Sequence, residues 1–103
     1  MRYRDILPEE VDALCQHVNL TIFDTREVNY FAQEHLDGAV PISDQAIKKM
    51  IIHKQRHNPV LVYCYHGNNS KEICNLLNGM GFSDVYNLEG GWLAWRNFIS
   101  ETI

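Results

Sequence analysis

The segment VLVYCYHGNNS, residues 60–70, contains a cysteine that ends an apolar run. A thiol becomes a strong nucleophile when it loses its proton, and nearby backbone N–H groups or a helix N-terminus lower the pKa that controls this step. Gly67 tolerates a positive φ, and Asn68 and Asn69 adopt left-handed conformations more readily than most residues. The segment therefore predicts a curled backbone cradle behind Cys64 for a thiolate, a persulfide or an oxyanion. The predicted cradle consists of Tyr65, His66, Gly67, Asn68, Asn69 and Ser70.

Short apolar segments alternate with helical patterns along the chain. The sequence predicts strands at residues 20–23, 39–42, 58–64 and 85–88, and helices at residues 8–18, 27–34, 44–55, 70–80 and after Gly90-Gly91. This alternation is typical of a parallel sheet with helices on both faces, so we expect an α/β fold. Ligands of such sheets bind beyond the carboxyl ends of the strands, which is where the sequence puts Cys64.

Apolar spacing predicts the buried face of each helix. The predicted inner faces are Val11, Leu14, Cys15 and Val18 in the first helix; Ile47, Met50 and Ile51 in the third; Ile73, Leu76, Leu77 and Met80 in the fourth; and Trp92, Trp95 and Phe98 in the last. Ser43 or Asp44 is the expected N-cap of the third helix. Cys15 and Cys74 are thus interpreted as core residues.

The composition indicates one ordinary domain, residues 1–103, whose length suffices for a core of its own. No apolar run is long enough for a membrane span, no signal peptide is recognisable, and the three cysteines do not suggest a disulfide framework. We therefore expect a cytoplasmic protein without a membrane partner. The net charge of −4 disfavours nucleic acid, yet residues 44–71 carry five positive and one negative side chain. Lys71 is the positive residue nearest the cysteine loop, and it could steer an anion towards the site or belong to a solvated helix face.

Three segments together resemble the rhodanese family, especially the small single-domain thiosulfate sulfurtransferases of the GlpE type. These segments are CYHGNNS (64–70), IFDTRE…FAQEHLDGAVPI (22–42) and VYNLEGGWLAW (85–95), and the resemblance spans nearly the whole chain. It implies a rhodanese-like sheet of about five mostly parallel strands, with Cys64 as the sulfur-carrying nucleophile and no cofactor. It also implies mainly structural roles for Asp24, Arg26, His35, Gly38, Gly90, Gly91 and Trp95. Asp24 and Arg26 could instead orient the cysteine loop without touching the substrate.

The loop departs from many rhodaneses, which carry arginine one and five residues after the cysteine. Tyr65 and Asn69 stand at these positions, as non-arginine residues also do in the GlpE-type loop. This departure removes fixed positive charge from the cradle and puts tight binding of thiosulfate in doubt. Tyr65 could wall the pocket or simply pack, and His66 could stabilise a thiolate or be solvated. A second departure is Glu34, directly before His35, where the family usually has a glycine.

A metal site is not expected. His53, His57, Cys64 and His66 make a nominal ligand set, but His57 lies beyond the helix end, which makes a common face doubtful.

The resemblance and the loop favour sulfur transfer through a Cys64 persulfide, from thiosulfate or another donor to cyanide or a thiol, with a thioredoxin-like protein as one acceptor. One alternative is a persulfide-carrying module of a protein sulfur relay. Another is a phosphatase or arsenate reductase on the same scaffold, but these enzymes have an arginine at the sixth position after the cysteine, where this chain has Ser70.

Overall fold

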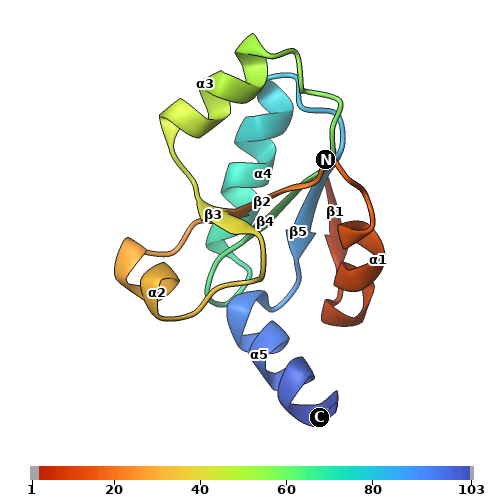
Figure 1. Ribbon diagram of the computed structural model, residues 1–103, viewed down its shortest axis with the longest axis vertical. Coiled ribbons are helices and arrows are strands. Elements are labelled where there is room, and N and C mark those ends of the chain that lie inside the picture. Colours follow the sequence, from red (N-terminus) through yellow and green to blue (C-terminus); the bar gives the residue numbers. More distant parts are fainter. Residues whose placement is uncertain (1–2, 103) are drawn as a thin grey trace.

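Five parallel strands form one sheet in the order β1-β5-β4-β2-β3 (Figure 1). The computed structural model describes residues 3–102. The strands are β1 (Tyr3–Ile6), β2 (Thr21–Asp24), β3 (Ala39–Pro41), β4 (Val60–Tyr63) and β5 (Val85–Leu88). The helices are the short 3-10 helix η1 (Pro8–Glu10), α1 (Val11–Cys15), α2 (Val28–Gln33), α3 (Asp44–Ile52), α4 (Asn69–Gly79) and α5 (Gly91–Thr102).

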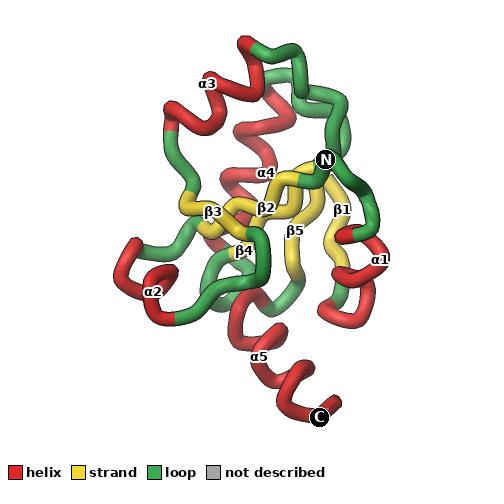
Figure 2. The backbone as a smooth tube through the Cα atoms, in the orientation of Figure 1, coloured by secondary structure: helices red, strands yellow, loops and turns green. Residues whose placement is uncertain are grey.

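Helices cover both faces of the sheet, as Figure 2 shows with the strands gathered between them. On one face, α3 and α4 pack through Ile47, Met50, Cys74 and Leu77 against Val60 and Val62 of β4. On the other face, Val11 of α1 and Trp92 of α5 pack with Leu61 and Tyr63 of the same strand. Because β4 is covered on both sides, all four of its residues are buried and apolar or aromatic. The predicted α/β fold with a parallel sheet is confirmed.

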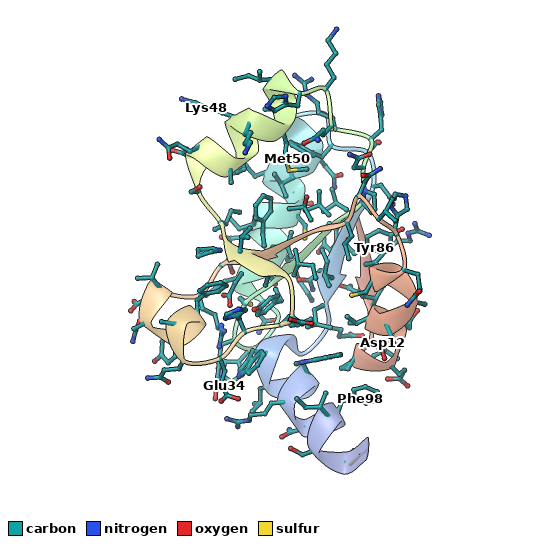
Figure 3. All side chains as sticks on the ribbon, viewed as in Figure 1. Asp12, Glu34, Lys48, Met50, Tyr86 and Phe98 are labelled. Atoms are coloured by element: carbon teal, nitrogen blue, oxygen red, sulfur yellow. The ribbon has the colours of Figure 1, made fainter. Side chains whose placement is uncertain are left out.

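The third helix follows the sequence pattern closely. Ser43 is its N-cap, since the Ser43 hydroxyl accepts a hydrogen bond from the Ala46 N–H at 3.1 Å. Met50 lies between α3 and α4, whereas Lys48 points away from the molecule (Figure 3). This amphipathic helix closes the core over β2 and β4.

The prediction for the first helix is wrong in the length of the helix and in the face that is buried. Residues 8–10 form a 3-10 helix, whose tighter turn shifts the phase of the following residues, and α1 ends at Cys15. Only Val11 of the four predicted inner residues is fully buried; Cys15 is exposed and Val18, beyond the helix, is 93% exposed. Cys15 is therefore not a core residue.

The buried face of α4 begins one turn earlier than predicted. Ser70, Cys74 and Leu77 are buried, while Leu76 is 51% exposed and Met80 is also exposed. Two of the three residues on this buried face are a polar serine and a small cysteine, which is why the spacing of large apolar residues does not identify it. Cys74 is a core residue as predicted, and its burial raises the pKa of the thiol to about 12.

Strand β1 was not predicted from the sequence. Tyr3 and Ile6 are buried in the cores on opposite faces of the sheet, and the exposed Arg4 and Asp5 between them interrupt the apolar pattern. It pairs in parallel with β5, and Asp5 lies directly opposite Asn87. None of the helices formed by residues 3–102 has the length and apolar composition needed to cross a bilayer.

Candidate active site around Cys64

Cys64 is the first residue after β4 and lies at the carboxyl edge of the sheet. Its position continues the alternation of Val62, so its side chain is on the face that α4 covers. The following loop leads directly into α4, and Cys64 as a whole residue is 5% exposed. The strand and the helix thus hold one thiol at the edge where parallel sheets bind their ligands.

Hydrogen-bond donors converge on the Cys64 sulfur. The Gly67 N–H donates to Sγ at 3.0 Å, and the Ser70 hydroxyl lies 3.3 Å from Sγ. Burial alone would raise the pKa of this thiol. Hydrogen bonding from the side chain and backbone of Ser70 and from the backbone amides of Gly67 and Asn69 outweighs burial, and the pKa is lowered from its ordinary value. The site therefore stabilises the thiolate relative to that of an ordinary cysteine.

Gly67 is required for the shape of the loop. Its φ is +92°, as its role in the predicted cradle demands, and a Cβ there would lie 2.7 Å from the Gly90 nitrogen. Gly91 has the reciprocal constraint, because its Cβ would lie 2.5 Å from the Cys64 carbonyl oxygen. The double glycine thus lets the end of β5 come into contact with the Cys64 loop.

The start of α5 holds the same loop by hydrogen bonds. The Trp92 N–H donates to the Cys64 carbonyl at 2.8 Å, and the Leu93 N–H donates to the Tyr65 carbonyl at 3.1 Å. The first-turn N–H groups of a helix have no partner within the helix, so the loop carbonyls satisfy them. Two helix starts, those of α4 and α5, consequently meet at Cys64.

The two asparagines do not take the conformation predicted for them. Asn68 has φ −96° and ψ −47°, and Asn69 is the first residue of α4. Lys54 is the single non-glycine residue with positive φ within residues 3–102. The curl of the loop thus depends on Gly67 alone, because the chain enters right-handed helix immediately after it.

A cleft of about 460 Å³ opens beside Cys64. Its walls include the two tyrosines Tyr30 and Tyr65, whose ring centroids are 6.5 Å apart, so Tyr65 does wall the pocket. Tyr65 also meets the His66 ring edge to face at 4.7 Å, and both residues are exposed. The complete lining is Thr25, Arg26, Glu27, Tyr30, Cys64, Tyr65 and Asn69.

Asp24 and Arg26 form a buried ion pair under this cleft. Arg26 Nη2 lies 2.7 Å from Asp24 Oδ2, and the side chains are 4% and 0% exposed. Arg26 also donates to the Glu34 carbonyl at 2.7 Å, and its guanidinium lies 4.7 Å from the centre of the Trp92 ring. Its charge is therefore already neutralised, and the pair joins β2 to the α2–β3 connection and to α5.

Tyr63 completes this pair and was missed by sequence reasoning. Its hydroxyl donates to Asp24 Oδ2 at 2.6 Å and accepts from the Leu36 N–H at 3.2 Å. Burial, and then the hydrogen bond to Asp24, raise the pKa of Tyr63, so it stays neutral. A tyrosine at the end of an otherwise aliphatic strand is the signal that could have identified it.

Asn87 was missed as well. It is a fully buried polar residue in the apolar strand β5, and the Ser70 hydroxyl donates to its Oδ1. Asparagine is depleted in strands, so its place in VYNL could have marked it for attention.

The remaining predicted residues lie outside the immediate Cys64 contacts. His35 is exposed and stacks on Phe31 at 3.9 Å, Gly38 has φ +85°, and Trp95 is partly buried beside Phe98. Lys71 is half-buried in the first turn of α4 and is absent from the lining of the cleft. Among residues 3–102, no three His, Cys, Asp or Glu side chains are grouped as a metal site would require.

Comparison with known proteins agrees with this geometry. A sequence profile of the rhodanese-like domain matches residues 7–98. A relative from Ectopseudomonas mendocina, thiosulfate sulfurtransferase GlpE, is 35% identical over 97% of this chain and 92% of its own. Two solved structures share the fold. A rhodanese-related protein from Thermoplasma volcanium has a TM-score of 0.74 at 23% identity, covering 93% of both chains. A protein from Rhodopseudomonas palustris, described as a possible tyrosine phosphatase, has a TM-score of 0.77 at 19% identity, covering 93% of this chain and 81% of its own.

Proposed function

Because this chain belongs to the family of rhodanese-like domains, we propose that it is a sulfurtransferase in which Cys64 carries the transferred sulfur atom. The observation that carries the proposal is the convergence of the Gly67 amide and the Ser70 hydroxyl on the Cys64 sulfur, beside an open cleft. The relatives named thiosulfate sulfurtransferase, at 35% identity over nearly the whole chain, support thiosulfate as the donor.

In the first step, the Cys64 thiolate attacks the outer sulfur of thiosulfate. The new sulfur–sulfur bond forms as the bond to the sulfonate sulfur breaks, and sulfite leaves with the electron pair. Cys64 then holds a persulfide, whose outer sulfur carries the negative charge. The amides that stabilise the thiolate suit this second anion as well, so the step requires no general base.

In the second step, an acceptor removes the outer sulfur and restores the Cys64 thiolate. Cyanide would leave as thiocyanate, and a thiolate acceptor would leave as a persulfide. The cleft opens between Tyr30 and Tyr65, with room for a small thiol or for a cysteine on a thioredoxin-like protein. The proposal places the protein in a reducing compartment such as the cytoplasm, because turnover needs a free thiol. It also treats residues 1–103 as one domain.

A relay module that receives its sulfur from a protein would use the same residues, so it differs from the enzyme only in its donor. A phosphatase is not favoured. The Ser70 hydroxyl at the sixth position is buried between Cys64 and Asn87. It cannot make the bidentate pair of hydrogen bonds that an arginine makes to an oxyanion.

The test is intact mass spectrometry after incubation with thiosulfate. We expect the gain of one sulfur atom, its loss when cyanide is added, and the release of thiocyanate. Cys15→Ser should behave like the parent chain, since Cys15 is not part of the cleft lining, whereas Cys64→Ser should gain no sulfur. A chain that stays unmodified by thiosulfate but accepts sulfur from a protein persulfide would be a relay module.

A further inference from the structure

Asn87 is a buried polar side chain within reach of the catalytic loop. It lies on β5, on the face that α4 covers, and it is 0% exposed. Its neighbour across the sheet is Asp5 of β1, and Val62 of β4 is its partner on the other side. A polar group in this position costs free energy unless it is fully hydrogen-bonded, so its partners indicate what it does.

The orientation of the Asn87 amide is determined by its partners. Its Nδ2 donates to the Asp5 carboxylate at 2.9 Å and to the Gly67 carbonyl at 3.3 Å. Both partners can only accept hydrogen bonds, so the nitrogen must face them. The oxygen Oδ1 is thereby directed at the Ser70 hydroxyl.

The Ser70 hydroxyl has one hydrogen and two acceptors that compete for it. Its oxygen contacts Asn87 Oδ1, which can only accept, and lies 3.3 Å from Cys64 Sγ. While Cys64 is a thiol, the Ser70 hydrogen satisfies Asn87, and the thiol S–H can donate to the Ser70 oxygen. When Cys64 loses its proton, the sulfur also becomes an acceptor, and the single hydrogen cannot serve both.

We propose that Asn87 is a positioning residue for the Cys64 nucleophile, which competes with the Cys64 sulfur for the Ser70 hydrogen while its amide nitrogen ties the Gly67 loop to β1. This inference rests on the proposed role of Cys64 and deepens it. A hydrogen bond to a charged sulfur is stronger than one to an amide oxygen, so the Ser70 hydroxyl rotates towards the thiolate. The rotation leaves Asn87 Oδ1 without this donor. Asn87 therefore opposes the thiolate, and the protein balances thiolate content against nucleophilicity, which falls as thiol pKa falls.

Several other charged or titratable groups lie on the elements that meet near Cys64, and the variants leave them unchanged. Asp5 touches Asn87 directly, whereas the others do not. These groups are Asp5 on β1; Asp24, Arg26 and Glu27 after β2; Tyr30 on α2; Tyr63, Tyr65 and His66 around Cys64 itself; Lys71, Glu72 and Cys74 on α4; and Glu89 after β5.

The test is the pKa of Cys64, measured from the pH dependence of its alkylation by iodoacetamide. All variants carry Cys15→Ser, because Cys15 is exposed and would also react. Asn87→Leu removes the competing acceptor at similar volume and should lower the thiol pKa by roughly 0.5–1 unit, the equivalent of one hydrogen bond. Asn87→Ala is the second variant if the leucine is not accommodated. Thermal unfolding verifies that each variant is folded at the assay temperature.

Ser70→Ala tests whether Asn87 acts through the hydroxyl. In this background Asn87→Leu should leave the Cys64 pKa unchanged, since the shared hydrogen is gone. A pKa that falls equally with and without Ser70 would overturn the proposal and indicate a rearranged loop.

Alkylation reports on the thiol without any sulfur donor. If the protein accepts no sulfur from thiosulfate but shows the expected pKa cycle, the proposed donor fails while the role of Asn87 stands. If sulfur transfer is normal and the cycle is flat, the role of Asn87 fails alone.

Discussion

At the scale of single residues, the chemistry proposed for this chain depends on one sulfur atom and the donors around it. Replacing Cys64 by serine keeps nearly the same shape, but a hydroxyl stays protonated near neutral pH and cannot form a persulfide. We expect Cys64→Ser to abolish thiocyanate production and to leave the thermal unfolding midpoint close to that of the parent chain. Cys74→Ser is the matched control. It should keep most activity and lose stability, because it puts a hydroxyl into the core. Activity of Cys64→Ser at the parent rate would exclude the proposed nucleophile.

Gly67 is the second position where one residue controls the site. Valine there must adopt φ +92°, and its Cβ would lie 2.7 Å from the Gly90 backbone. Gly67→Val should therefore reduce turnover far more than it reduces stability, because the loop can move away while the sheet stays intact. Thiocyanate release and urea unfolding measure the two effects. Gly79, where a Cβ has no atom within 4 Å, supplies the control substitution Gly79→Ala. Parental turnover in Gly67→Val would refute the backbone cradle.

At the scale of elements, the Asp24–Arg26 pair joins the end of β2 to the segment before β3 and to α5. Asp24 accepts from both Arg26 and Tyr63, and these three side chains are almost fully buried. Asp24→Asn removes the counter-charge while keeping the volume, which leaves a buried guanidinium unpaired. We expect a loss of about 3–5 kcal/mol in the free energy of unfolding, measured with urea.

The exposed pair Arg4–Asp84 offers the comparison for this prediction. Its side chains are 72% and 35% exposed and 3.5 Å apart, so the same change, Asp84→Asn, should cost less than about 1 kcal/mol. Equal losses for the two variants would mean that burial of the Asp24–Arg26 pair is not what makes it important.

At the scale of the whole molecule, the positive residues of the segment 44–71 are separated by the fold. Figure 1 shows α3 beside the far end of α4, whereas the Cys64 loop leads into the start of α4. Lys48 points outward from α3 (Figure 3). Lys71 is thus the member of this group that lies at the start of α4, next to the loop.

Lys71→Glu tests whether this charge attracts the donor. Thiosulfate carries two negative charges, and the chain has a net charge of −4, so a reversed charge near the cradle should raise the KM for thiosulfate several-fold at low salt. The effect should shrink at high salt, since the Debye length is only ~8 Å at physiological ionic strength. Lys48→Glu makes the same change in net charge on α3 and should alter KM less. Equal KM values for both variants and the parent chain at low salt would leave capture to the backbone donors.

Local patterns in the sequence were sufficient to predict much of the local structure of this protein. The apolar run before Cys64, the glycine after it and the serine ahead of residues 44–52 each depend on neighbours within a few positions, and the structure confirms them. The resemblance of three segments to one family supplied the five-stranded sheet, of which the residues alone predicted four strands.

Contacts between distant segments were decided only by the tertiary structure. Asn87 meets Asp5 across 82 positions and Gly67 across 20, and Tyr63 meets Asp24 across 39, because strand order brings these residues together. The exposure of Cys15 and Leu76 likewise depends on where each helix begins its turn and which surface it meets. The spacing of apolar residues in the sequence shows that they recur on one face of a helix. Packing against the sheet determines which face is buried. For that reason Cys64 and its loop could be proposed as a site from the sequence, whereas the contacts that Asn87 and Tyr63 make with distant segments could not.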